Sequence, residues 1–143
     1  MGRRHSLATA AEARPQGRLS GITLDAGALI ALDRDDRRVL VLLARAAELG
    51  SRVTVPATAL AQAMRRPARR ARLSRLIRQP GTVLVPLDGP DATSVGVLLA
   101  ATRTSDIADA HVVVCARRHR EAIVTSDPDE IDRLDPTARL IAI

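Results

Sequence analysis

Two kinds of hydrophobic pattern alternate along this chain. Short runs rich in Val, Ile, Thr and Leu predict strands, and between them apolar residues recur at helical spacing and predict helices. The predicted strands cover residues 21–25, 52–55, 82–86, 121–125 and 139–143, and the predicted helices cover residues 26–32, 37–49, 57–64, 68–78, 91–101, 106–118 and 129–134. Strands that alternate with helices pair in parallel through right-handed crossovers. We therefore predict an α/β fold, a three-layer α/β/α sandwich with a central, mostly parallel sheet of about five strands.

This pattern is missing before residue 21. The first segment carries a basic excess, with Arg3, Arg4, Arg14 and Arg18 against Glu12, and it lacks the continuous apolar stretch of a secretory signal. We predict a disordered basic tail over residues 1–20 and a single domain over residues 21–143. No apolar segment approaches the length of a membrane span, and the single cysteine has no disulfide partner. We expect a cytoplasmic protein that does not associate with a membrane.

The composition excludes several kinds of chemistry. Phe, Tyr and Trp are absent, which argues against nucleic-acid binding by base stacking on aromatic rings. All 22 basic side chains other than histidine are Arg, so lysine Schiff bases and P-loop lysines are excluded. The net charge of +6 suits a polyanionic partner.

The arginines are concentrated in one acid-free segment, residues 49–87. We predict that four of them contact RNA phosphates in a sequence-independent manner: Arg65, Arg66, Arg69 and Arg70. Two alternatives remain open for this run, because charged runs are often a solvated helix face and can also bind an acidic protein segment.

Four aspartates lie at the predicted ends of strands and starts of helices. Asp25 closes the first strand, Asp127 follows the fourth, and Asp106 and Asp109 begin the helix that leads into the fourth strand. In an open parallel sheet these positions share one edge. Each acid also has a plain local role as a helix cap or turn residue. Carboxylates this close repel unless they are protonated or neutralised, so we predict a hard divalent cation, Mg²⁺ with Mn²⁺ as an alternative.

The remaining metal-ligating residue types do not form a cluster in the sequence. His111 and Cys115 lie one helical turn apart within an apolar run, and we interpret both as packing residues. Zinc is therefore not expected. Carboxylates that hold magnesium on a basic protein indicate phosphodiester chemistry, in which the cation activates water and polarises a phosphoryl oxygen.

Three segments, 24–32, 109–113 and 124–127, resemble the acidic motifs of PIN-domain nucleases, particularly the VapC-type toxin ribonucleases of bacterial toxin–antitoxin pairs. The resemblance implies a PIN-like domain and an Mg²⁺-dependent endoribonuclease. It implies that Asp25, Asp109 and Asp127 bind the metal, that Asp106 is a further acid near them, and that Thr125 or Ser126 orients a carboxylate or water. It also implies an antitoxin partner and a homodimer.

One position departs from the family pattern. Many relatives carry a Glu where this chain has Gln62, and an amide brings no negative charge to a metal. We consider Gln62 an auxiliary residue that holds water or a phosphate oxygen. The departure motivates an alternative function, a catalytically weak PIN-like module that binds RNA or protein.

Overall fold

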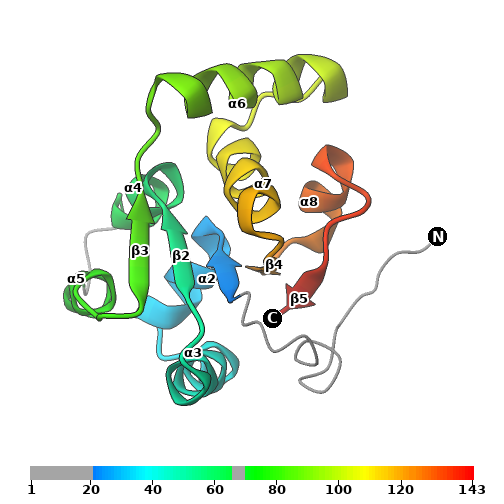
Figure 1. Ribbon diagram of the computed structural model, residues 1–143. Coiled ribbons are helices and arrows are strands. Elements are labelled where there is room, and N and C mark those ends of the chain that lie inside the picture. Colours follow the sequence, from blue (N-terminus) through cyan, green and yellow to red (C-terminus); the bar gives the residue numbers. More distant parts are fainter. Residues whose placement is uncertain (1–20, 66–69) are drawn as a thin grey trace.

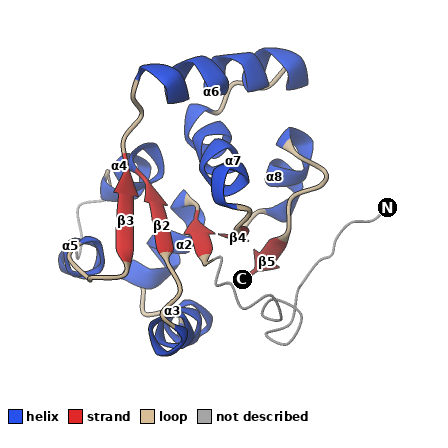
Figure 2. Ribbon diagram, in the orientation of Figure 1, coloured by secondary structure: helices blue, strands red, loops and turns tan. Residues whose placement is uncertain are grey.

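The computed structural model describes residues 21–65 and 70–143. Its centre is a single sheet of five strands in the order β3-β2-β1-β4-β5, and every neighbouring pair is parallel (Figure 2). The strands are β1 (Ile22–Leu24), β2 (Val53–Pro56), β3 (Thr82–Val85), β4 (Ala122–Thr125) and β5 (Leu140–Ala142). The predicted strands are confirmed to within about one residue at each end, and the sheet is parallel throughout.

Seven helices connect these strands: α2 (Ala26–Asp33), α3 (Arg37–Leu49), α4 (Ala57–Met64), α5 (Ala71–Ile77), α6 (Gly89–Thr102), α7 (Ile107–His119) and α8 (Pro128–Leu134). In Figure 1, α6, α7 and α8 form one group, whereas α3 and α5 lie on the other side of the strands. The chain passes from β1 through β2 to β3 in one direction along the sheet, and from β3 through β4 to β5 in the other. Right-handed crossovers in opposite directions place their helices on opposite faces of the sheet. The predicted three-layer α/β/α sandwich is confirmed.

Local signals explain where the helices begin and end. The Asp36 carboxylate caps α3 by accepting hydrogen bonds from the backbone of Arg38 and Val39, and Gly50 ends this helix at φ 67°, where glycine is favoured. Helix α6 begins two residues before its predicted start because Asp88 caps it and Pro90 fits its first turn. The predicted helix over residues 68–78 is observed from Ala71. Residues 1–20 and 66–69, including the predicted tail, lie outside the described residues.

The core is aliphatic, as a chain without aromatic residues requires. The three inner strands contribute Leu24, Val55, Ile123 and Val124, all fully buried. Helix α7 packs against β1, β2 and β4, and it is buried on most of its first two turns. Because α7 is held on three strands, its first turn is fixed over the carboxyl ends of β1 and β4.

A buried polar cluster fixes the opposite, amino edge of the sheet. The Glu121 side chain is fully buried and accepts hydrogen bonds from Thr23 Oγ1 and Arg52 Nε, each at 2.8 Å. Buried carboxylates are tolerated when they are paired and hydrogen-bonded in this way. No helix in residues 21–65 and 70–143 has the length and hydrophobicity needed to span a bilayer.

Candidate metal centre

The carboxyl edge of the sheet carries the predicted acids. Strand β1 runs directly into Asp25, which is buried and caps α2 by accepting a 2.8 Å hydrogen bond from the backbone N–H of Ala28 at Oδ1. The backbone N–H of Asp25 also donates a 3.2 Å hydrogen bond to the carbonyl oxygen of Val124 in β4. The Asp25 side chain is thus held rigidly where the two central strands end.

A second group of acids lies across the starts of α7 and α8. Asp106 caps α7 by accepting a hydrogen bond from the backbone N–H of Asp109 at 2.9 Å. One carboxylate oxygen each of Asp106, Asp109 and Glu130 lies within 4.8 Å of the other two. The same three residues, with Arg133, line an open cavity of about 310 Å³. Negative charge is therefore concentrated in a solvent-accessible cavity between the first turns of α7 and α8.

These carboxyl groups perturb one another. Partial burial, together with the neighbouring carboxyl groups of Asp106 and Glu130, raises the pKa of Asp109 from 3.8 to about 7. The charge of Asp25 also contributes to this pKa, so Asp25 lies near the same centre. Burial raises the pKa of Asp25 as well, and the charge of Asp127 acts in the same direction. Such mutual repulsion is relieved by a cation.

The donor set matches a hard divalent cation. All the converging ligand atoms are carboxylate oxygens, which Mg²⁺ and Mn²⁺ prefer over the softer nitrogen and sulfur donors of zinc sites. Two of the three clustered acids are only partly buried and Asp106 is exposed, so water can complete the coordination that Mg²⁺ usually retains. The charge of Asp25 acts on Asp109, and Glu130 lies directly beside Asp106 and Asp109.

Asp127 lies at the start of α8 and, like Asp25, is not among the residues that line the acidic cavity. It is exposed and caps α8 by accepting a hydrogen bond from the backbone N–H of Glu130 at 3.3 Å, which helps to fix the start of that helix. Its own N–H donates to Thr125 Oγ1 at 2.9 Å, and Thr125 also bonds Asp25. Thr125 therefore contacts the Asp25 side chain and the Asp127 backbone, and its predicted role in orienting a carboxylate or water stays a prediction.

Ser126 lies against the start of α2. A Cβ atom placed on Gly27 would come 2.0 Å from Ser126 Oγ, so only glycine allows this serine to sit so close to the helix. The same hypothetical Cβ would be 3.4 Å from Asp25 Oδ1. Ser126 and Asp25 consequently share one narrow region above the ends of β1 and β4.

Other predicted residues lie away from the cavity. Gln62 is exposed on the last turn of α4 and is not among the residues that line the acidic cavity. Arg65 is exposed directly after α4 and Arg70 is exposed directly before α5, and neither of them lines the cavity. Arg66 and Arg69 lie outside the described residues. The predicted roles of Gln62 and these arginines stay predictions.

Glu130 and Arg133 are the residues that sequence reasoning missed. A signal for Glu130 was present: it follows Asp127 by three positions at a helix start, the same spacing as Asp106 and Asp109. Acids at i and i+3 share a helix face. Arg133 lies one turn further along α8 and forms a 3.4 Å ion pair with Glu130. It is the one arginine that lines the cavity, within the part of the chain that the structure describes.

Comparison with known proteins agrees with this architecture. The family model of the PIN domain matches residues 22–135. Among solved structures, VapBC2 from Rickettsia felis bound to a DNA fragment from its promoter is similar, with a TM-score of 0.60, 15% identity, and coverage of 85% of this chain and 98% of that chain. At this identity the likeness shows a shared fold. A search of curated proteins gives no significant match. Because the family model spans most of the chain, from β1 to the end of α8, this protein belongs to the PIN domain family.

Proposed function

We propose that this protein is an Mg²⁺-dependent endoribonuclease and the toxin of a toxin–antitoxin pair. PIN domains are generally nucleases, which supports phosphodiester hydrolysis. The single observation that carries the proposal is the convergence of Asp106, Asp109 and Glu130 beside Asp25 at the carboxyl edge of the sheet. Clustered, mutually repelling carboxylates at an accessible edge are typical of a site for a hard cation that works on phosphates.

The residues divide into holding and positioning groups. Asp25, Asp109, Asp106 and Glu130 would hold the cation, with Asp127 as a further ligand. When bound, Mg²⁺ polarises a phosphoryl oxygen and lowers the pKa of a coordinated water. Thr125 would orient the Asp25 carboxylate through the hydrogen bond described above, and Ser126 would hold a water beside it.

Phosphate recognition is assigned to arginines. Arg133 borders the acidic cavity, where its guanidinium group can contact a phosphate next to the scissile bond. Arg65, Arg66, Arg69 and Arg70 would bind the strand further from the site. Without aromatic side chains the protein has no stacking platform, so binding would depend on phosphate charge and fall steeply with salt.

A cleavage assay tests this proposal. The wild-type protein is incubated with a mixed set of single-stranded RNA oligonucleotides and with DNA oligonucleotides of the same sequence, in Mg²⁺, Mn²⁺ or EDTA. We expect metal-dependent cleavage of RNA that is lost in Asp25→Asn and Asp109→Asn. The matched control is Asp129→Asn, which removes an exposed acid of the same helix as Glu130 and outside the cavity.

Two outcomes would contradict the proposal. Folded wild-type protein that leaves all RNAs intact in both Mg²⁺ and Mn²⁺ would favour the alternative, a PIN-like module that binds RNA or protein without cutting. Cleavage that persists unchanged in Asp25→Asn and Asp109→Asn would place the activity elsewhere.

The proposals of an antitoxin partner and a homodimer concern a surface away from the acidic cavity. An apolar groove of about 760 Å³ lies between α3, α5 and β3, and exposed apolar side chains border it on α3 and on the edge strand. Among these, Leu40 is 40% exposed and Val83 is 44% exposed. The VapBC2 structure contains a toxin-type chain with its partner, which supports an antitoxin for this chain. Light scattering of the purified protein tests the homodimer, and an antitoxin-like reading frame beside the gene tests the toxin assignment.

A further inference from the structure

A second cluster of metal-ligating side chains lies between α6 and α7, where the nuclease proposal makes no use of it. Asp91 comes from the first turn of α6, and His111 and Cys115 come from α7. His111 and Cys115 are four residues apart and share one helix face. The three residues are 4%, 0% and 1% exposed, and one potential ligand atom of each lies within 4.8 Å of the others.

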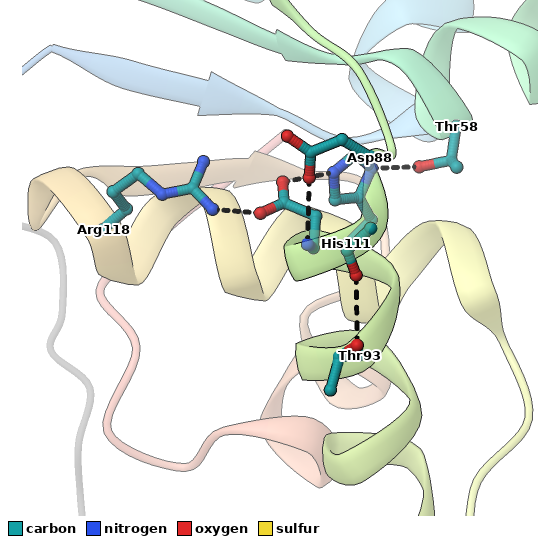
Figure 3. Close-up of polar contacts among 7 residues, drawn as sticks. Thr58, Asp88, Thr93, His111 and Arg118 are labelled. Atoms are coloured by element: carbon teal, nitrogen blue, oxygen red, sulfur yellow. Dashed lines mark hydrogen bonds and ion pairs between the residues drawn. The ribbon is translucent and has the colours of Figure 1, made fainter.

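The imidazole of His111 is held at both nitrogen atoms. Its Nδ1 lies 2.7 Å from Thr58 Oγ1, and its Nε2 lies 3.1 Å from Asp91 Oδ2. Figure 3 shows the ring of His111 between Thr58 on one side and the start of α6 on the other. Without a metal, Nε2–H donates to the Asp91 carboxylate and Nδ1 accepts from the Thr58 hydroxyl; when a cation takes the place of the Nε2 proton, the ring adopts the other tautomer and Nδ1–H donates to Thr58 Oγ1. Metal-binding histidines are commonly oriented by such an outer hydrogen bond.

The Asp91 carboxylate is similarly oriented. Its Oδ1 accepts a hydrogen bond from the guanidinium group of Arg118, while Oδ2 faces His111 (Figure 3). Arg118 remains 41% exposed, so its charge is largely solvated. One oxygen of Asp91 is therefore anchored by an outer partner and the other is directed at the cluster, the arrangement found for metal-ligating carboxylates.

The ligand types point to a softer cation than the acidic site takes. A carboxylate oxygen, an imidazole nitrogen and a thiol sulfur are the three ligand types of zinc, and three protein ligands plus one water make a common four-coordinate site. Burial and the charge of Asp91 raise the pKa of the Cys115 thiol to about 12, so the metal-free cluster holds a protonated thiol. Zn²⁺ replaces such a proton when it binds.

We propose that Asp91, His111 and Cys115 form a Zn²⁺ site that joins α6 to α7, with Thr58 and Arg118 as its outer hydrogen-bonding partners. Binding forms a Zn–S bond to Cys115 and releases the thiol proton to solvent. The site is separate from the oxygen-only cluster of Asp106, Asp109 and Glu130, and it does not depend on nuclease activity.

Cobalt spectroscopy provides a direct test because Cys115 is the only cysteine in the chain. Protein stripped with chelator is titrated with Co²⁺, which occupies zinc sites and gives a thiolate-to-cobalt charge-transfer band when a cysteine is a ligand. We expect this band to saturate at one equivalent and to disappear when Zn²⁺ is added. An oxygen-only site gives no such band. Absence of the band in folded wild-type protein would overturn the proposal.

Two variants separate this site from the acidic centre. Cys115→Ala is expected to abolish the cobalt band and the rise in melting temperature on adding Zn²⁺, and it leaves a small apolar side chain in the core. Asp109→Asn is expected to keep both signals, even where it abolishes RNA cleavage. A Zn²⁺-induced rise that is equal in wild type and Cys115→Ala would also overturn the proposal.

Discussion

Replacing Asp109 with Asn is expected to stabilise the metal-free protein at pH 8, although it removes a proposed metal ligand. The folded protein holds the Asp109 proton up to a pH of about 7, whereas an unfolded chain releases it near 3.8. Between these two values the folded state binds more protons than the unfolded state, so the free energy of unfolding falls as pH rises. Asn mimics the protonated acid, because it is neutral and can still donate to Glu130.

The magnitude follows from the size of the pKa shift. A rise from 3.8 to about 7 corresponds to about 4 kcal/mol, since one pKa unit is about 1.4 kcal/mol. Asp109 is partly open to solvent, so we halve this figure for screening, to about 2 kcal/mol. For a domain of this size such a gain raises the melting temperature by about 4–8 °C.

Thermal unfolding of both proteins in EDTA at pH 5 and pH 8, followed by circular dichroism, measures this effect. The variant should be more stable at pH 8, and the difference should shrink at pH 5, where Asp109 is already protonated. Adding Mg²⁺ at pH 8 should stabilise the wild type more than the variant, because the cation relieves the same repulsion. A variant that is equally or less stable at pH 8, or a difference independent of pH, would refute the reasoning.

Three further substitutions probe the site and its supports. Glu130→Gln should weaken Mg²⁺ binding by about tenfold or more in calorimetric titration, and unchanged affinity would remove Glu130 from the site. Gly27→Ala should lower the free energy of unfolding by about 1–2 kcal/mol, because the new Cβ collides with Ser126 Oγ. In a Ser126→Gly background the substitution should no longer lower the free energy of unfolding. An equal loss in that background would mean that the collision with Ser126 is not its cause. Arg52→Met should lower stability in urea by about 2 kcal/mol because it leaves the buried Glu121 without its cation, and an unchanged midpoint would mean that this ion pair contributes nothing.

Local patterns were sufficient to predict most of the fold. Apolar runs and helix caps depend on neighbours within a few residues, so the strands and the helix limits could be predicted from the sequence. The convergence of Asp25, Asp106, Asp109 and Asp127 at one edge also followed, because parallel strands place their carboxyl ends on the same side of a sheet. The central position of β1 between β2 and β4 is the arrangement that makes this edge a single site.

Contacts between elements that are distant in sequence could be identified only from the tertiary structure. Glu130 lies close to Asp106 and Asp109 only because α7 and α8 pack together. The spacing of these residues in the sequence does not predict that the two helices begin side by side. Asp91 lies 20 residues before His111, and only the packing of α6 on α7 brings its carboxylate to the ring. Composition and periodicity determine which segments are buried, and the geometry of packed side chains decides which buried groups touch. The sequence alone therefore predicted the acidic edge, and the tertiary structure decided which acids lie close together and added a second, mixed cluster.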